Sequence, residues 1–232
     1  MPAEAVATGT AISCEGAGLT VGDAVLLHEV DLRLTAGRTA VIGANGSGKS
    51  TFARMLNGLR LPTAGGLRVH GLDPMRDAKA LRRHVGFVFT NPEAQLLMPT
   101  PAEDLALSLP DVPRSDRAAR VARILAEHDL ADRADVPVSG LSGGQRQLLA
   151  IASVLATDPG LVVADEPTTL LDLRNARRIG DLLLGLDVPL VLVTHDLELA
   201  ARCDEAVLFE DGTVRAVGEP AAVIDEYRRS CA

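Results

Sequence analysis

A glycine-rich segment, Gly43-Ala44-Asn45-Gly46-Ser47-Gly48-Lys49-Ser50-Thr51, directly follows the short apolar segment 38–42. It matches the pattern G-x-x-x-x-G-K-[ST], whose glycines let the backbone curl so that several N–H groups point at phosphate oxygens. The residues after it, 49–58, are predicted to form a helix, whose N-terminal end adds a partial positive charge. We therefore expect this phosphate loop to bind ATP, with Lys49 reaching the β- and γ-phosphates and Ser50 binding Mg²⁺. The residues predicted to hold the nucleotide here are Gly43, Asn45, Gly46, Ser47, Gly48, Lys49, Ser50 and Thr51.

Strands and helices alternate on both sides of this loop. Such alternation predicts an α/β fold with a mostly parallel sheet covered by helices. Segment 25–34 is predicted to be rich in strand, and Asp211-Gly212 to be the turn of a hairpin. The other predicted strands are 65–72, 85–89, 161–164 and 190–194, and the other predicted helices are 172–184 and 220–229.

The texture changes between about 91 and 157. Prolines separate short helical pieces, and Ser115 is predicted to cap a helix with apolar residues at helical spacing. We expect an inserted helical lobe at approximately 91–157, and one core built from approximately 1–90 and 158–232, within a single domain.

Two further motifs carry chemistry. The apolar strand 161–164 ends in Asp165 and Glu166, at the sheet edge where open α/β sheets bind ligands. Asp165 suits a Mg²⁺ ligand and Glu166 a general base for water, although such a pair is equally often an exposed turn. The segment Leu141-Ser142-Gly143-Gly144-Gln145 precedes the predicted helix 146–157 and forms a second potential anion site. A single phosphate loop does not require a second anion site, yet this chain has both.

Composition excludes several classes of function. The 232 residues carry a net charge of −8, with a pI near 5.1 and only 2% aromatic residues, so we expect no nucleic-acid partner. Three distant cysteines indicate a reduced protein without structural disulfide or zinc. The start of the chain, residues 1–4, has no leader pattern, and no apolar run approaches the length of a membrane span.

In this order, the phosphate loop, Leu-Ser-Gly-Gly-Gln, the acidic strand end and His195 resemble the ATP-binding cassette (ABC) ATPases over nearly the whole chain. The resemblance implies a P-loop NTPase core with an N-terminal antiparallel β part and an inserted helical subdomain. It also implies two cassettes packed head to tail, so that Ser142, Gly143, Gly144 and Gln145 meet the ATP held by the other cassette. The implied roles are catalytic base for Glu166, γ-phosphate contact for His195, and dimer communication for Asp172.

Two departures from the family pattern stand out. Thr90 occupies the place where the family usually has a Gln that binds Mg²⁺, so that contact is expected to be indirect or lost. The family often stacks adenine on an aromatic residue before the phosphate loop, and here we expect the aliphatic residues 19–21 to take its place.

The run from Asn91 to Leu96, with Glu103-Asp104 downstream, resembles the cassettes of energy-coupling factor importers of vitamins, cobalt or nickel, and most of all the biotin type. The implied partners are a second copy or a paralogous cassette, a transmembrane coupling protein that docks near 90–105, and a membrane protein that captures the substrate. The chain would then work at the cytoplasmic face of the membrane. The alternatives are another ABC transporter class, a ribosome- or DNA-associated ABC ATPase, or a plain P-loop kinase, which would lack Leu141–Gln145.

Overall fold

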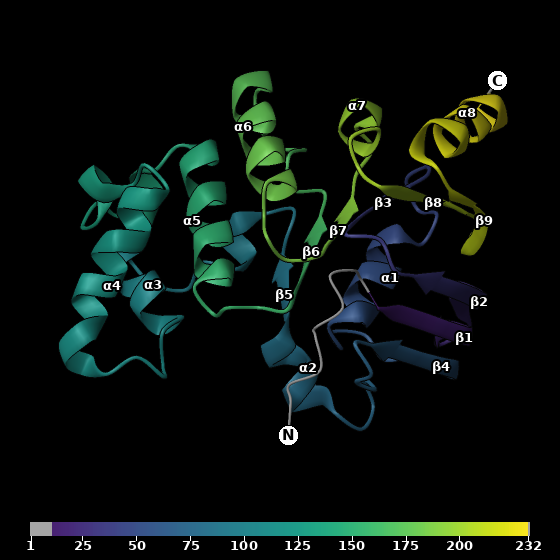
Figure 1. Ribbon diagram of the computed structural model, residues 1–232, viewed down its shortest axis with the longest axis horizontal. Helices are drawn as coiled ribbons and strands as arrows, with labels where there is room; N and C mark the ends of the chain where they lie inside the picture. Colours follow the sequence, from purple (N-terminus) through teal and green to yellow (C-terminus); the bar gives the residue numbers. More distant parts are fainter. Residues whose placement is uncertain (1–10, 232) are drawn as a thin grey trace.

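The computed structural model describes residues 11–231, so the stretch 1–4 considered above lies outside the described part. A six-stranded sheet runs through the middle of the molecule (Figure 1). Its strands are all parallel except the last, β9, which pairs antiparallel with β8. In spatial order they are β5 (Val85–Val88), β6 (Leu161–Asp165), β7 (Leu190–Val193), β3 (Arg38–Ile42), β8 (Glu205–Glu210) and β9 (Thr213–Gly218).

A second, antiparallel sheet has the order β2 (Ala24–Leu34), β1 (Ile12–Val21) and β4 (Ala64–Val69). Strand β1 was not predicted, because its pairing with β2 shifts register three times along its length and Gly16 adopts a φ of +58°. These irregularities interrupt the simple alternation by which a strand is recognised in a sequence. The predicted α/β class, with an antiparallel β part and a parallel core, is confirmed.

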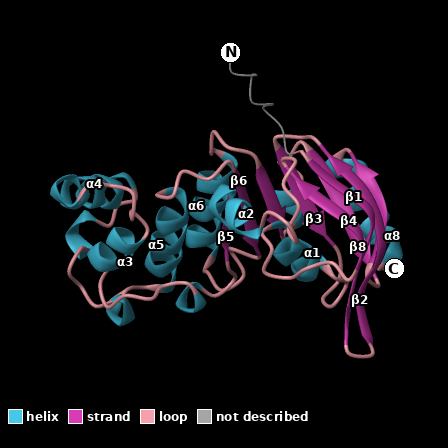
Figure 2. Cartoon of the chain, turned by 90° about the horizontal axis from the view of Figure 1, so that it is seen from below, coloured by secondary structure: helices cyan, strands magenta, loops and turns pink. Residues whose placement is uncertain are grey.

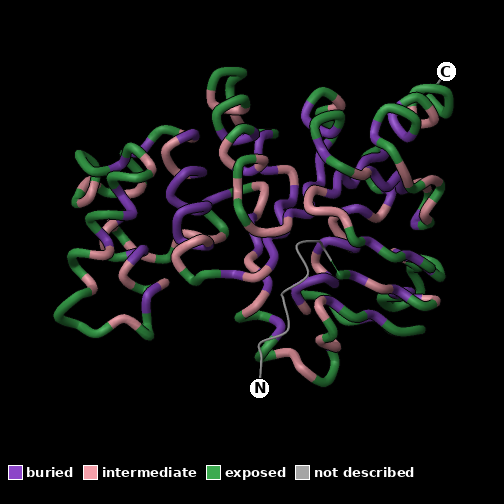
Figure 3. The backbone as a smooth tube through the Cα atoms, in the orientation of Figure 1, coloured by how far each residue is buried: buried purple, intermediate pink, exposed green. Residues whose placement is uncertain are grey.

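Two hydrophobic cores lie on the two faces of the six-stranded sheet. Side chains alternate along each strand, so that Ala40 and Ile42 enter one core while Val41 enters the other. The first core is closed by helices, and the second by the antiparallel sheet together with α1 (Lys49–Leu56) and the buried side chain of α2 (Ala78–His84), Leu81. Figure 3 shows this buried centre, with exposure increasing toward the helix ends and loops.

The remaining helices divide into two groups. Helices α3 (Pro101–Leu107), α4 (Arg114–Glu127) and α5 (Gly143–Leu155) pack together at the end of the molecule opposite the antiparallel sheet (Figure 2). The others follow the strands of the core: α6 (Leu173–Leu184), α7 (Leu197–Ala200) and α8 (Pro220–Ser230). Short 3₁₀ turns complete the chain at η1 (Pro92–Ala94), η2 (Ala131–Arg133) and η3 (Val138–Gly140).

The N-terminal cap of α4 differs from expectation. Ser115 does not cap α4, because the helix already begins at Arg114 with Pro113 at the N-cap position, and the Ser115 hydroxyl donates to Asp116 instead. Within residues 11–231, no helix combines the length and the apolar character that crossing a bilayer requires.

Candidate functional site

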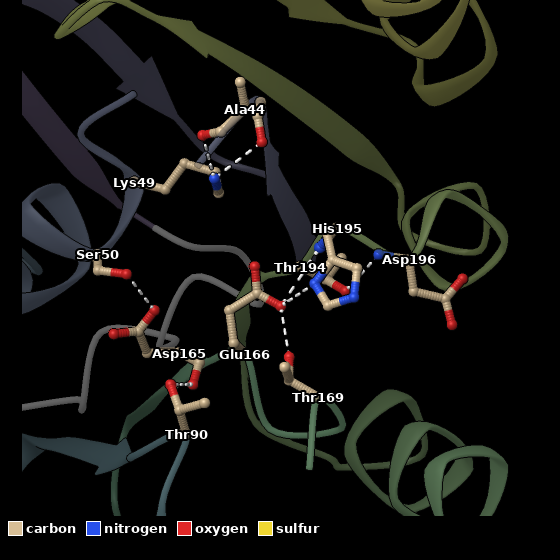
Figure 4. Close-up of polar contacts among 11 residues, drawn as sticks. Ala44, Lys49, Ser50, Thr90, Asp165, Glu166, Thr169, Thr194, His195 and Asp196 are labelled. Carbon is tan, nitrogen blue, oxygen red and sulfur yellow. Dashed lines mark hydrogen bonds and ion pairs between the residues drawn. The ribbon is translucent and has the colours of Figure 1, made fainter. Parts of the chain in front are cut away.

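The phosphate loop joins the carboxyl end of β3 to the first turn of α1 (Figure 4). Gly43 has a φ of +141°, and a Cβ atom there would lie 2.1 Å from the carbonyl oxygen of Phe209. Gly48 caps α1 with a φ of +101°, and a Cβ atom on it would lie 2.7 Å from Leu27. Only glycine meets both requirements, a left-handed backbone and no side chain. The predicted helix 49–58 ends at Leu56, two residues earlier than expected.

Lys49 is held inside this loop. Its side chain is buried, and Nζ donates to the carbonyl oxygens of Gly43 and Ala44, each at 2.8 Å. Burial lowers the pKa of Lys49, while the carboxylates of Glu166 and Asp165 raise it. A polyphosphate bound here would favour the charged ammonium in the same way as these carboxylates do.

Ser50 and Asp165 meet across the gap between α1 and β6. The Ser50 hydroxyl donates to Asp165 Oδ1 at 2.7 Å, and the Arg54 guanidinium lies 3.7 Å from Oδ2. Burial raises the pKa of the Asp165 carboxyl, against the opposite effects of the Ser50 hydrogen bond and the Arg54 charge. A hydroxyl and a carboxylate are the hard oxygen ligands that Mg²⁺ prefers, so this donor set fits that ion. Within residues 11–231, no group of three or more His, Cys, Asp or Glu side chains is placed to hold a metal ion.

Glu166 gathers three contacts on one carboxylate oxygen. Its Oε2 accepts from the Thr169 hydroxyl at 2.9 Å, lies 2.7 Å from His195 Nδ1, and accepts from the His195 backbone N–H at 3.4 Å. Glu166 has a φ of +52°, an uncommon conformation for a residue with a side chain. The structure thus brings Glu166 and His195 together from the ends of neighbouring strands β6 and β7. Thr169 was missed, because a hydroxyl three residues after an acid is too common to stand out.

A cavity of about 540 Å³ lies over the phosphate loop. Its lining comes from residues 45–51 of the loop, from Glu166, and from two elements that the sequence analysis did not connect with the site. These are Val25 and Leu26 on β2, and Asp211 and Gly212 in the turn between β8 and β9.

The residues proposed to replace the adenine-stacking aromatic, 19–21, do not line this cavity. The first of them, Leu19, is buried in the core, because β1 lies between β2 and β4 and only β2 borders the loop. The Gly212 backbone N–H donates to the Ser47 carbonyl at 3.0 Å and thereby fixes the turn against the loop. A loop-to-turn contact across 165 residues leaves no local signal in the sequence.

The segment Leu141–Gln145 forms the start of α5, and it does not line the cavity over the phosphate loop. The helix begins at Gly143, three residues earlier than predicted, because Ser142 and Gln145 form a reciprocal capping box. The Gln145 N–H donates to the Ser142 hydroxyl at 3.2 Å, and the Ser142 N–H to the Gln145 amide oxygen at 2.9 Å. Ser142 is exposed, whereas Gly144 is buried so closely that a Cβ atom there would lie 2.5 Å from the Asn175 side chain.

Asp172 and Thr90 lie outside the cavity lining as well. Asp172 is the N-cap of α6, where its carboxylate accepts from the Asn175 backbone N–H at 2.9 Å and from its side-chain amide at 2.8 Å. These hydrogen bonds lower the pKa of Asp172. Thr90 follows β5, and its hydroxyl donates to the backbone carbonyl of Asp165 at 2.7 Å (Figure 4). The Thr90 hydroxyl therefore contacts the backbone of Asp165 at the end of β6 and not its carboxylate.

Comparisons with known proteins agree with this geometry. The family model described as ABC transporter matches residues 27–169. An ABC transporter ATP-binding protein of Bartonella quintana (strain Toulouse) is 46% identical, over 90% of this chain and 93% of its own length. The biotin transport ATP-binding protein BioM of Rhizobium etli is 41% identical, over 95% of this chain and 99% of its own length.

Two solved structures share the fold. One is cbiO1 from Clostridium perfringens, part of the ABC transporter complex cbiONQ, with a TM-score of 0.82 at 28% identity over 94% of this chain and 92% of that one. The other is a dimeric ATP-binding cassette in a post-hydrolysis state, bound to ADP and Pi, with a TM-score of 0.79 at 28% identity over 90% of this chain and 98% of that one. The phosphate loop, the acidic end of β6 and these relatives together show that the chain belongs to the ABC transporter family, as one of its ATP-hydrolysing cassettes.

Proposed function

We propose that this chain is the motor subunit of an importer of the energy-coupling factor class, and that ATP binds between two cassettes packed head to tail. The observation that carries the proposal is the separation of two anion-binding helix starts within one chain. The start of α1 lines the cavity, while the exposed start of α5 lies outside it. A second cassette that brings its own Ser142, Gly143, Gly144 and Gln145 over this cavity would complete the site.

The residues around the cavity suit an attack of water on the γ-phosphate. Lys49 would turn from the loop carbonyls to the phosphates, and Glu166 would accept the proton of the attacking water. With Glu166 as a carboxylate, which only accepts hydrogen bonds, His195 Nδ1 would carry the proton toward Glu166, and Nε2 would be free to contact the γ-phosphate. Ser50 and Asp165 would hold Mg²⁺, which when bound neutralises charge on the phosphate oxygens.

The remaining assignments complete the proposal. Residues 91–157 would form the helical lobe that carries the Leu141–Gln145 segment, on a core built from 1–90 and 158–232. Asp172 would communicate between the two cassettes, since it caps α6 and holds Asn175 against Gly144. Thr90 would sense the nucleotide only indirectly, through the Asp165 backbone.

The substitution Glu166→Gln tests the composite site and the catalytic base together. It keeps the size of the side chain and removes the basic oxygen, so kcat should fall about 10³-fold while ATP binding persists. With ATP and Mg²⁺ the variant should also accumulate as a dimer, measured by analytical ultracentrifugation with phosphate release in parallel. Undiminished hydrolysis would refute the role of Glu166, and a variant that stays monomeric with ATP bound would refute the composite site.

The assignment to the importer class is supported by the names of the relatives and by a groove that we propose as a docking site. BioM of Rhizobium etli is named for biotin transport, and cbiO1 for its place in a transporter complex. Biotin is our first candidate for the substrate, and another vitamin, cobalt or nickel are the alternatives. A cavity of about 340 Å³ lies between α2, β5, α3 and α5, and the exposed apolar side chains Leu97 and Leu107 line it. A helix of the transmembrane coupling protein would dock there, with this face of the cassette turned toward the membrane.

Purification of the tagged chain from membranes of its own cell tests this assignment. We expect a coupling membrane protein and a small substrate-capture membrane protein to copurify, and Leu97→Asp to lose both while ATPase activity of the isolated cassette is kept. Copurification of a different type of membrane protein would point to another ABC transporter class. Ribosomes or DNA in their place would overturn the transport function while leaving the ATPase intact.

A further inference from the structure

The backbone of Phe89, directly before Thr90, is held from both sides by glutamine side chains. The Gln95 amide oxygen accepts from the Phe89 N–H at 3.3 Å, and the Gln147 amide nitrogen donates to the Phe89 carbonyl at 3.4 Å. The Gln95 amide nitrogen also donates to the Ala150 carbonyl of α5 at 2.9 Å. Gln147 itself belongs to α5. We call these contacts of Gln95 and Gln147 the amide clamp.

Within the amide clamp, Gln147 is buried and Gln95 is half-buried. Gln147 is 1% exposed, and it is followed in α5 by the buried apolar residues 148–152. A buried amide costs free energy unless it is hydrogen-bonded. For packing alone, an apolar side chain would serve equally well. The three hydrogen bonds connect the residue after β5 to helix α5, directly through Gln147 and indirectly through Gln95, which follows η1.

Both elements lead to the ATP site, from opposite directions. Phe89 is followed by Thr90, whose hydroxyl donates to the Asp165 carbonyl at the end of β6. Asp165 in turn accepts from Ser50 in the phosphate loop. At the other end, α5 begins with Ser142 and Gly143, five and four residues before Gln147. A path of hydrogen bonds and covalent links therefore runs from Ser50 through the side chain and backbone of Asp165 to the Thr90 hydroxyl, along the peptide bond to Phe89, and from Phe89 to α5.

We infer that the amide clamp transmits the occupancy of the phosphate loop to the start of α5, and that Gln147 is its main positioning residue. When ligand changes the position of Asp165, Thr90 and Phe89 move with it, and the clamp obliges α5 to follow. The inference rests on the proposed composite site, in which the start of α5 meets the ATP of a second cassette. It assigns to Gln95 and Gln147 the link from Phe89 to α5, while the Thr90 hydroxyl provides the preceding link to the Asp165 carbonyl.

Hydrogen exchange on the dilute, monomeric chain tests the clamp without requiring dimerisation. In the parent chain, ATP with Mg²⁺ should slow amide exchange in the phosphate loop and also in 142–150. In Gln147→Met, which keeps the length of the side chain and removes the amide, the phosphate loop should still respond while 142–150 should not. A response of 142–150 that persists in this variant would overturn the inference, and so would its absence from the parent chain.

Two further variants separate coupling from stability. Ser153→Ala removes a buried hydrogen bond from the same helix, that of the Ser153 hydroxyl to Asp104 at 3.0 Å, without touching Phe89. It should keep the response of 142–150 even where its melting temperature falls as far as that of Gln147→Met. Gln95→Met serves as a second clamp variant and should weaken the response in the same direction.

Steady-state kinetics give an independent readout. Gln147→Met should lower kcat between about 3-fold and 30-fold, the range of moderate coupling changes, while the dissociation constant of ATP for the monomer stays within about twofold. A loss of monomer binding would instead mark the residue as part of the phosphate site and overturn the inference. Failure of the proposed function would look different, because the parent chain itself would then neither hydrolyse ATP nor dimerise with it.

Discussion

The phosphate loop and the Leu141–Gln145 segment are both glycine-containing helix starts, yet they differ in how their backbone N–H groups are satisfied. Gly48 at the start of α1 provides no side-chain cap, so the first-turn N–H groups remain available to a ligand in the cavity. At the start of α5, Ser142 and Gln145 cap each other. The first start is enclosed by the turn of β8 and β9 and by β2, and the second is open to solvent at Ser142.

From this difference we expect the phosphate loop to hold an anion within one chain, and the start of α5 to contact an anion that is held by another chain. An uncapped helix start with a buried lysine is costly unless an anion completes it. A self-capped start is stable alone and can meet a ligand that is already bound elsewhere. Substitutions in the phosphate loop should therefore weaken ATP binding to the monomer, whereas substitutions at the start of α5 should leave that binding intact and lower kcat.

The largest contrast is expected between Lys49→Met and Ser142→Arg. Lys49→Met removes the buried cation of the phosphate loop and should weaken ATP binding to the monomer at least about 100-fold. Ser142→Arg should leave that binding within about twofold, because Ser142 lies outside the cavity, and should still lower kcat about 100-fold by blocking the second cassette. Isothermal titration and phosphate release distinguish the two.

Mixing these two inactive variants sharpens the contrast. In a head-to-tail pair, the intact loop of the Ser142→Arg chain would meet the intact α5 start of the Lys49→Met chain. Random pairing of equal amounts then restores about one quarter of the parental activity, provided each site works alone. If the mixture forms no ATP-dependent dimer and stays inactive, the two regions do not share a site. Each variant assayed alone at twice the concentration is the control.

A smaller effect concerns Asp165, which links the phosphate loop to β6. Because burial raises the pKa of this carboxyl above its ordinary value of 3.8, its ionised form destabilises the nucleotide-free fold. Asp165→Asn should therefore stabilise the chain near pH 7 by about 0.5–2 kcal/mol, while weakening Mg²⁺-dependent ATP binding.

The pH dependence of this gain has a definite sign. The cost of the ionised carboxyl grows as the pH rises through the window between 3.8 and the raised pKa of the folded state. The advantage of Asp165→Asn should accordingly shrink as the pH falls toward 3.8, measured by urea unfolding at several pH values. A gain that is constant with pH would contradict the burial effect.

The smallest effect is expected at β2, against which we expect the base of the nucleotide to lie. Val25 lines the cavity and is 50% exposed, whereas Val21 is 48% exposed and does not line it. Val25→Tyr would add a stacking surface and should tighten ATP binding about 2- to 10-fold, the size of an aromatic contact. Val21→Tyr is the matched control and should leave affinity unchanged. Equal effects of the two substitutions would instead place the base of the nucleotide near the end of β1.

Much of the site was predictable because it depends on contiguous residues. The phosphate loop, the acidic end of β6 and the turn at Asp211 each have their geometry written in neighbouring positions. Strand β1 was not predictable, because its register shifts break the alternation that marks a strand. The start of α5 was placed three residues late, because glycines in the first turn hid the capping box.

From the amino-acid sequence alone we could predict the α/β class, the phosphate loop and the position of Lys49, Ser50, Asp165 and Glu166 at one edge of the sheet. These follow from local backbone requirements and from the rule that parallel strands end at the same edge. Three sets of contacts are visible only in the folded chain. Val25 and the turn at Gly212 close the cavity, and Thr169 and His195 share one oxygen of Glu166. Gln95 and Gln147 hold the backbone of Phe89. Those contacts join residues far apart in the chain, and their partners are fixed by how the sheets and helices pack.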